Sequence, residues 1–372
     1  MGAAVKGIVV AIVVIMALTA VYYVVEDTNL LNGVVTTTTS SYQIPSEITT
    51  HFSRNFTFTS SSSSGETFTF YFTPTINDSL QQSNIAISHS SNVNETVKSS
   101  QNRTFVALQI SPGNSYVNVS YNIKSYSKIW KNDTNSSGLI SQIPSSLKSE
   151  YDHPEYFNSS GGSLEVINPS FFRNITLNLT KNDTTVVEKL RSIYNYIVQN
   201  YRYNITYNLG NVPLSAQQVY QLKEGDCEEL SYLFESMSRS IGIPSWTQYG
   251  LLIQDTNGQT SLGEHAWVQT YIPTSNGTGN FVNIDLTVEV GGKDLGRGFL
   301  VKFPYSLVEW TDNGNSTAMV AYHTELLAPS NGINIALQEN DSVYSFTEYG
   351  NITIAQANLF YLPVAYTSKD QV

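Results

Sequence analysis

The pattern of apolar and polar positions divides the chain into stretches of different period. Residues 7–25 are apolar without interruption, and residues 52–130 contain short runs in which apolar and polar positions alternate. Residues 184–242 repeat at helical spacing, and residues 246–290 alternate again. Alternation is typical of half-buried strands, whereas a repeat of three to four positions is typical of amphipathic helices. Helices followed by antiparallel strands predict an α+β domain in the second half of the chain.

The first stretch predicts a membrane helix. Gly7 to Val25 is uncharged and has about the length that a helix needs to cross a bilayer. Lys6 precedes it and Glu26 follows it, so the positive-inside rule predicts a cytoplasmic N-terminus and an external remainder. A cleaved signal peptide is an alternative, although Leu18-Thr19-Ala20 is a poor cleavage site. A pilin-type signal is a third interpretation. We predict a single transmembrane anchor within residues 1–30, in the cell membrane.

The next part of the chain predicts a linker and then a β-sandwich. Residues 31–50 are rich in Thr and Ser and have no helical period, which is typical of a linker. Residues 51–178 include alternating runs such as Thr67 to Phe72 and Tyr116 to Ile123, separated by prolines and glycines. No residue pattern there indicates chemistry, so we expect a spacer or a ligand-recognition module. Residues 322–372 show further strand-like runs and form a C-terminal β segment.

Residues 179–321 are predicted to form the chemically active domain. Thr185 and Glu188 have the spacing of a capping box before a helix, and a shorter helix is expected from Ser215. A third helix is expected over Cys227 to Ser240. Three strand patterns follow: Trp246 to Gln254, Ala266 to Ile272 and Phe281 to Val290.

Composition adds information about location and partners. Only 13% of the residues are charged, so Asn, Ser, Thr and Tyr must supply the polar surface, as in extracytoplasmic proteins. The formal net charge of −11, without clusters of Lys and Arg, disfavours nucleic acid, so we expect no nucleic-acid partner. The single cysteine cannot form an intrachain disulfide, so stability must come from packing.

Asn-x-Ser/Thr triplets support an external, glycosylated protein, because all of them follow the predicted anchor. Some must occur by chance in a chain that is rich in Asn, Ser and Thr. They begin at Asn55, Asn77, Asn94, Asn102, Asn118, Asn132, Asn135, Asn158, Asn174, Asn178, Asn182, Asn204, Asn276, Asn315, Asn340 and Asn351.

Cys227 lies where a loop enters an amphipathic helix, and this position makes it a candidate nucleophile. A helix N-terminus offers free amide donors and partial positive charge, which favour the thiolate that attacks carbonyl groups. A lone cysteine is more often a buried core residue, so the position needs support from a neighbouring base. Asp226, Glu228 and Glu229 oppose a negative sulfur. An imidazolium close to the sulfur would decide the balance.

His265 and Asp285 are the candidate partners of Cys227. His265 lies on a strongly patterned strand, and Asp285 lies on the next one, so adjacent strands can bring them within hydrogen-bonding distance. The expected roles are nucleophile, base and orienting acid. Trp267 shares the face of His265 and is expected to be a core residue. The remaining histidines are expected to be structural or surface residues: His51, His89, His153 and His323. The sequence indicates no cofactor and no metal site, because zinc needs more closely spaced ligands.

Three segments around these residues resemble a known family. GDCEELSYLFESMSRSIGIPS, EHAWVQTYIP and FVNIDLT are similar to the Cys, His and Asp blocks of the transglutaminase-like superfamily, in the same order. The resemblance covers about Thr184 to Thr311. It implies a papain-like domain with helices packed on an antiparallel sheet and a catalytic triad of Cys227, His265 and Asp285. The family often has Asp-Pro in the third block, where this chain has Asp285-Leu286, so the following turn is expected to differ.

The resemblance implies acyl transfer at peptide or side-chain amides through a thioester. Transfer of the acyl group to water is the reaction of a cysteine protease or amidase, whereas transfer to a lysine amine is the reaction of a transglutaminase. We slightly favour hydrolysis. The backbone amide of Cys227, with Tyr220 or Gln217, is expected to stabilise the oxyanion. A protein, peptide or glycopeptide is the expected substrate. The alternative is a non-catalytic binding or envelope protein that keeps the fold, and the composition is similar to that of archaeal surface proteins.

Overall fold

The computed structural model describes most of the chain after the predicted anchor. It covers residues 39–357, except for 63–64, 101–102, 131–136, 160–161, 206–211, 257–258, 275–276, 289–296, 315–323 and 328–332. The predicted membrane stretch, residues 7–25, lies outside the described residues. Among the helices that are described, none has both the length and the apolar character of a membrane span. Tyr42–Ile354 form one compact unit.

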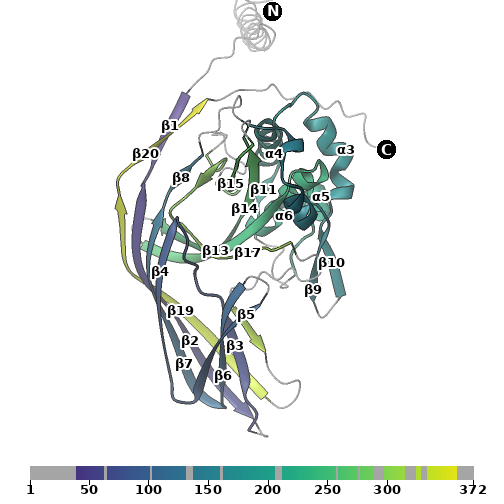
Figure 1. Ribbon diagram of the computed structural model, residues 1–372. Coiled ribbons are helices and arrows are strands. Elements are labelled where there is room, and N and C mark those ends of the chain that lie inside the picture. Colours follow the sequence, from purple (N-terminus) through teal and green to yellow (C-terminus); the bar gives the residue numbers. More distant parts are fainter. Residues whose placement is uncertain are drawn as a thin grey trace, which may run out of the picture. The chain divides into compact units, whose positions relative to one another are not determined.

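Along the sequence, most of the helices follow the purple and blue strands and precede the green and yellow ones (Figure 1). The helices are η1 (Ile140–Gln142), α2 (Ser145–Tyr151), α3 (Pro169–Leu179), α4 (Val186–Asn200), α5 (Ala216–Leu222) and α6 (Cys227–Ser240). The strands before and between them are β1 (Thr39–Ile44), β2 (Glu47–Ser62), β3 (Phe68–Phe72), β4 (Gln81–His89), β5 (Val93–Ser100), β6 (Arg103–Ile110), β7 (Gly113–Tyr126), β8 (Lys128–Ile129), β9 (Glu155–Ser159), β10 (Gly162–Ile167), β11 (Arg202–Tyr203) and β12 (Glu224–Gly225). Those that follow are β13 (Ser245–Thr256), β14 (Gln259–Pro273), β15 (Gly279–Ile284), β16 (Val301–Lys302), β17 (Ser306–Thr311), β18 (Thr324–Leu327), β19 (Ile333–Tyr349) and β20 (Ile352–Ala357). The predicted α+β class is confirmed.

Two four-stranded sheets hold the N-terminal strands, in the orders β18-β3-β6-β5 and β19-β2-β7-β4. Their inward side chains form one hydrophobic cluster, in which Phe52, Phe56 and Phe58 of β2 and Phe70 of β3 are at most 1% exposed. The alternation seen in the sequence therefore separates a buried face from a solvent face. β18 and β19, which follow the helices by more than 80 residues in the chain, complete these sheets by pairing with β3 and β2.

Part of the segment expected to be a linker is instead in strands. Within residues 31–50, Thr39–Ile44 form β1, and β2 begins at Glu47. The prediction of an irregular linker is wrong for these residues. Threonine is polar but β-branched, so a Thr-rich segment is well suited to a strand when a neighbouring strand is available for pairing.

The stretch 137–178 also differs from the β-rich domain predicted over residues 51–178. It contains α2 and α3, and Ile143, Phe157 and Phe172 pack in the core of the helices rather than in that of the N-terminal sheets. The prolines and glycines of this stretch separate short helices and strands. The change of core therefore comes before residue 143.

The helices pack on a third sheet, in the order β15-β14-β13-β17, with antiparallel pairing throughout. The apolar stripes of α4 and α6, including Leu190 and Leu233, meet Val268 of β14 in one buried cluster. The predicted capping box is confirmed, since the Thr185 hydroxyl accepts a bond from the Glu188 amide at 3.3 Å. The predicted helix from Cys227 to Ser240 and the first two antiparallel strands that follow are also confirmed, whereas the third, predicted to Val290, ends at Ile284.

The third sheet is joined to the N-terminal sheets rather than separated from them. Leu251, Ile253 and Leu307 of β13 and β17 belong to the same hydrophobic cluster as the phenylalanines of β2 and β3. The fully buried amide of Gln81 bonds to both backbone groups of Val308, at 2.8 and 3.0 Å. These contacts cover the outer edge of β17, so the N-terminal strands contribute to the core beneath the candidate site.

Candidate active site

Cys227 is the first residue of α6, as the sequence predicts. The helix starts there because the Asp226 carboxylate caps it, accepting the Glu229 amide at 3.0 Å, while Glu229 accepts the Asp226 amide at 3.0 Å. This arrangement leaves the thiol at the positive end of the helix dipole. The side chain of Cys227 is half-buried and packs against Tyr249, Ala266 and Trp310 of the third sheet.

The acidic residues next to Cys227 carry less charge than the sequence suggests. Glu228 is fully enclosed, and burial raises its pKa to about 8, although the hydroxyl groups of Tyr232 and Tyr249 donate hydrogen bonds to it. Burial and the charge of Asp226 raise the pKa of Glu229 to about 7. At neutral pH Glu228 is therefore mainly protonated. Glu228 and Glu229 therefore repel a negatively charged sulfur less strongly than the sequence alone implies.

His265 and Asp285 form a buried pair. The Nε2 atom of His265 lies 2.8 Å from Oδ2 of Asp285, and both residues are 5% exposed. β14 carries His265, while β15 ends at Ile284, so Asp285 is the first residue after the strand rather than a member of it. Because Nε2 is used by Asp285, Nδ1 is the ring nitrogen left for the sulfur of Cys227.

The two residues favour each other's charged forms. Burial lowers the pKa of His265, but the charge and hydrogen bond of Asp285, helped by the polar contact with Cys227, raise it to about 10. Burial raises the pKa of Asp285, but the charge and hydrogen bond of His265 outweigh this and hold it below its ordinary value. At neutral pH the pair is therefore an imidazolium and a carboxylate, and the imidazolium can stabilise a neighbouring thiolate.

Residues after the pair hold Asp285 in place. The hydroxyl and amide of Thr287 donate to Oδ1 of Asp285 at 2.8 and 3.0 Å, which leaves Oδ2 for His265. Leu286 is 2% exposed and packs in the helix core. The turn without proline is thus fixed by one buried leucine and one threonine.

A second group of polar residues supports β14 near His265. Trp267 is 2% exposed and donates from its indole nitrogen to Oε1 of Gln248 at 2.9 Å. The Asn283 side chain donates to the same oxygen at 2.6 Å. Gln248 therefore links the strands on both sides of His265. The prediction that Trp267 is a core residue is confirmed.

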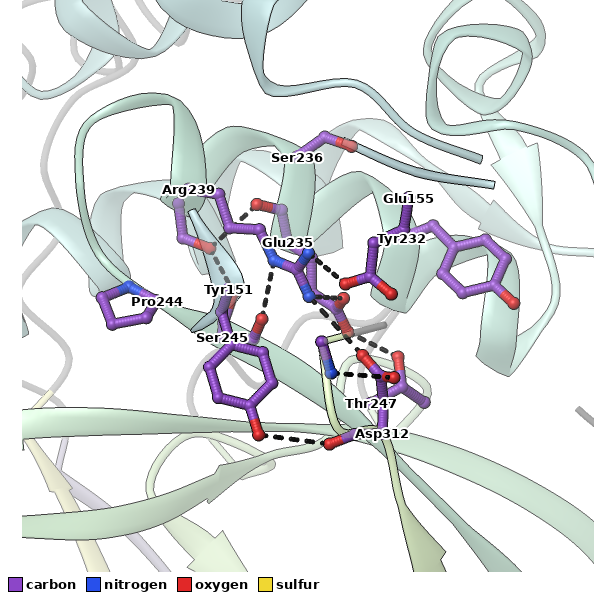
Figure 2. A network of polar contacts seen from close by, with 12 residues as sticks. Tyr151, Glu155, Tyr232, Glu235, Ser236, Arg239, Pro244, Ser245, Thr247 and Asp312 are labelled. Atoms are coloured by element: carbon purple, nitrogen blue, oxygen red, sulfur yellow. Dashed lines mark hydrogen bonds and ion pairs between the residues drawn. The ribbon is translucent and has the colours of Figure 1, made fainter. Parts of the chain in front are cut away.

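A buried ionic network fixes the other end of α6 to the sheet (Figure 2). The guanidinium of Arg239 lies 3.0 Å from Glu235, contacts Glu155 of β9, and lies 3.8 Å from Asp312. It also donates to the backbone carbonyl of Ser245 at 2.8 Å. Burial and the charge of Glu155 raise the pKa of Asp312 well above its ordinary value. The network holds the helix that carries Cys227 in one position on β13.

Tyr220 and Gln217, the two alternatives expected for the second oxyanion donor, both lie on α5. The ring of Tyr220 packs edge-on against Phe171 and Phe172, and the ammonium of Lys223 lies 4.0 Å from its centre. Tyr220 is therefore part of an aromatic cluster of α3 and α5. Gln217 lies on the same short helix and is half-buried.

Tyr203 also lies beside Cys227, although no sequence pattern predicts it there. It belongs to β11, which pairs in parallel with β12 so that Tyr203 is opposite Gly225. A hydrogen bond and charge interaction with Cys227 act on its hydroxyl group, and its side chain is 49% exposed. Neither periodicity nor motif spacing signals this residue, because the two-residue strand places it near the thiol only in three dimensions.

The other described histidines form local contacts away from the triad. His51 lies 3.2 Å from the hydroxyl of Ser120, His89 contacts the carbonyl of Ser90, and His153 contacts that of Glu150. These contacts agree with their predicted structural role. His323 lies outside the described residues.

Comparison with known proteins defines the class to which this site belongs. Residues 173–286 match the profile of the transglutaminase-like superfamily. The chain therefore contains a transglutaminase-like domain, a fold whose members are often cysteine proteases or transglutaminases. All three candidate residues lie within the matched range. No curated protein matches the sequence of the chain.

Solved structures agree at the level of the fold. A protein from Cytophaga hutchinsonii, provisionally described as a cysteine protease, has a TM-score of 0.56 at 12% identity, covering 85% of this chain and 100% of its own. The periplasmic domain of TgpA from Pseudomonas aeruginosa has a TM-score of 0.33 at 13% identity, covering 59% of this chain and 73% of its own. Red sea bream transglutaminase has a TM-score of 0.29 at 14% identity, covering 65% of this chain and 50% of its own. The similarity to the Cytophaga hutchinsonii protein supports the fold of helices packed on an antiparallel sheet.

Proposed function

We propose that the protein is a thiol acyl-transfer enzyme in which Cys227, His265 and Asp285 form the catalytic triad. The observation that carries this proposal is the buried hydrogen bond of 2.8 Å between His265 and Asp285. The imidazole of His265 also contacts the half-buried thiol of Cys227. A nucleophile, a base and a group that orients the base are the parts that covalent catalysis requires.

The proposed reaction begins with the thiolate of Cys227. Its sulfur attacks the carbonyl carbon of an amide, and the imidazolium of His265 gives its proton to the leaving amine as the carbon–nitrogen bond breaks. A thioester remains on Cys227. An acceptor activated by the now neutral His265 attacks the thioester and releases the acyl group. Asp285 keeps the ring oriented and favours its charged form throughout.

We favour water as the acceptor, so that the reaction is hydrolysis of a peptide or side-chain amide. The support is access, since Cys227 is half-buried and the neighbouring Tyr203 is 49% exposed, which gives solvent a route to the thioester. A lysine amine as acceptor would make the protein a crosslinking enzyme.

We further propose that the enzyme is anchored by residues 7–25 and acts outside the cell on a protein, peptide or glycopeptide. The support comes from the uncharged apolar stretch, the low fraction of charged residues and the many sequons after it. Protease accessibility of the chain on intact cells, with an epitope tag at each end, tests this orientation.

Labelling with iodoacetamide tests the catalytic proposal, and the single cysteine makes it specific for this site. We expect labelling of Cys227 at neutral pH and a large loss of labelling rate in His265→Ala. His51→Ala is a matched control, because this histidine lies on β2 and contacts Ser120. A thiol that does not react, or one whose labelling rate does not depend on His265, supports a non-catalytic binding or envelope protein instead. Libraries of peptides and glycopeptides then identify the substrate.

A further inference from the structure

Attack on a carbonyl group moves negative charge onto its oxygen, and this charge needs hydrogen-bond donors near the nucleophile. The first-turn amides of α6 supply backbone donors, because helix N-termini have amides without intrahelical partners. Asp226 caps the helix by accepting the Glu229 amide. A side-chain donor on the other side of the sulfur remains to be found, and Tyr220 is held in the aromatic cluster with Phe171 and Phe172.

The backbone on both sides of Tyr203 is tied to the segment that leads into Cys227. The Arg202 amide donates to the carbonyl of Lys223 at 3.0 Å, and the Asn204 amide donates to that of Gly225 at 3.0 Å. Only Asp226 separates Gly225 from Cys227. A parallel pair of strands therefore holds Tyr203 next to the start of α6, so that its backbone is fixed relative to that of Cys227.

The side chain of Tyr203 reaches the triad while it stays open to solvent. Burial, followed by the charges of Cys227 and Asp226, raises the pKa of Tyr203, and a hydrogen bond with Cys227 also contributes. The phenol is thus protonated at neutral pH and can donate. With 49% of its surface exposed, the residue is accessible to a substrate at Cys227.

We propose that the hydroxyl group of Tyr203 is the side-chain donor that stabilises the oxyanion formed at Cys227; this inference rests on the proposed function. The attacked oxygen is two bonds from the sulfur, so a donor that contacts the sulfur in the free protein is within reach of that oxygen. As the sulfur–carbon bond forms, the π electron pair of the carbonyl moves to the oxygen, which accepts the hydrogen bond. Tyr203 keeps its proton, and the pair returns when the leaving group departs.

The rival role for Tyr203 is to hold the thiol in place, and two reactions of Cys227 separate these roles. Acylation by p-nitrophenyl acetate passes through an oxyanion, whereas alkylation by iodoacetamide displaces iodide at a saturated carbon and forms none. A donor to the oxyanion affects only acylation. A residue that positions or activates the sulfur affects both reactions.

The experiment compares Tyr203→Phe with the unmodified full chain in detergent, and Tyr220→Phe serves as the matched control. We expect the p-nitrophenol burst of Tyr203→Phe to slow by about 10²-fold, as for the loss of one oxyanion donor, while its alkylation rate changes less than about threefold. Tyr220→Phe should retain both rates. Equal losses in both reactions, or no loss in either, would overturn the inference. If the unmodified chain gives no burst that depends on Cys227, the proposed function fails first, and that result is visible without any Tyr203 variant.

Discussion

Gly298 and Asp285 approach each other so closely that no side chain fits between them. The amide of Asp285 donates to the carbonyl of Gly298 at 2.8 Å, and a Cβ atom at Gly298 would lie 1.8 Å from the carbonyl oxygen of Asp285. Gly298 also donates from its amide to the hydroxyl of Tyr194 at 3.2 Å. The backbone that carries the orienting acid is therefore held by a residue for which glycine is required.

Replacing Gly298 by alanine should displace Asp285. The added methyl group meets backbone, which cannot rotate away, so the carboxylate must move relative to His265. We expect the labelling rate of Cys227 to fall by about tenfold or more, because loss of orientation alone weakens a catalytic base strongly. Gly263→Ala is the control, since its nearest contact would be an ordinary 3.8 Å to Gln254 on the same sheet. Equal rates for the two variants would contradict the role of Gly298.

Gly298 illustrates what the sequence can and cannot predict. The helix caps and the stripe of α6 follow from local rules, so Thr185, Glu188 and the start of α6 at Cys227 are predicted correctly. Asp285 and Gly298 are 13 positions apart in the chain, and no local rule predicts that their backbones meet. Tyr203 is similar, because it reaches Cys227 only through the pairing of two very short strands.

The domain organisation was predictable only in part, because apolar periodicity does not reveal which core an element joins. Leu251 and Leu307 lie in strands of the third sheet but pack with the phenylalanines of β2 and β3. Phe157 and Phe172 show the reverse, since they precede the predicted catalytic domain but pack with its helices. Alternation assigns a buried face to each strand, whereas the identity of the partner depends on contacts between distant parts of the chain.

Asp285→Asn tests the orienting acid through its effect on pH dependence. Asparagine keeps the shape of the side chain but removes the charge that raises the pKa of His265 to about 10. Without that charge, burial lowers the pKa, and the imidazolium is lost at a lower pH. We expect the pH at which the rate of Cys227 alkylation reaches half its maximum to rise, because a neutral imidazole does not stabilise the thiolate, with acylation slower by about 10²-fold or more. An unchanged midpoint would mean that Asp285 does not control the charge of His265.

Stability should decrease between pH 5 and pH 7.5. Burial raises the pKa of Glu228 to about 8 and, together with the charge of Asp226, that of Glu229 to about 7. A group with a raised pKa contributes stability that is complete below its unfolded value and is lost as the pH rises through its folded value. The raised pKa of His265 acts in the same direction at the upper end of this window. Burial lowers the pKa of Lys302 to about 8, so this residue changes stability only above the window.

The melting temperature measured by circular dichroism at the two pH values checks this prediction. We expect a decrease of several degrees from pH 5 to pH 7.5, and a smaller decrease in Glu228→Gln, whose neutral amide has no charge to bury. Glu95→Gln, at an exposed position on β5, should keep the decrease of the unmodified protein. The same decrease in all three proteins would show that Glu228 is not responsible.

Arg239 is expected to be essential for stability because it is the cation among three buried carboxylates. Its side chain and that of Glu235 are 0% exposed. Removing one partner of a buried ion pair leaves charge uncompensated, which typically costs about 3–5 kcal/mol. Arg239→Ala should lower the free energy of unfolding by about this amount in chemical denaturation. Arg202→Ala provides the contrast, because the side chain of Arg202 is 77% exposed in its pair with Glu224, and exposed pairs contribute about 0–1 kcal/mol. Similar effects of the two substitutions would disprove the importance of the buried network.

The transglutaminase-like part should not fold when it is cut from the rest of the chain. A fragment of residues 179–321 would expose Leu251, Ile253 and Leu307, which pack in the cluster of the N-terminal sheets. It would also lose Arg54, whose guanidinium lies 3.7 Å from Glu309 of β17 and 2.6 Å from Glu339 of β19. We therefore expect residues 39–357 to unfold cooperatively and to resist proteolysis, and the fragment to show neither property.

A chain that keeps both parts but weakens their contact tests the same idea without truncation. Leu251→Asp places a charge in the shared cluster, where burial of an unpaired charge is strongly unfavourable, whereas Leu337→Asp changes a residue that is 40% exposed on β19. We expect the first variant to lose the arrangement of Cys227 and His265, seen as slower alkylation that no longer depends on His265, while the second keeps the rate of the unmodified protein. If Leu251→Asp retained normal, His265-dependent labelling, the two parts would fold independently, and the N-terminal sheets would not be needed to build the site.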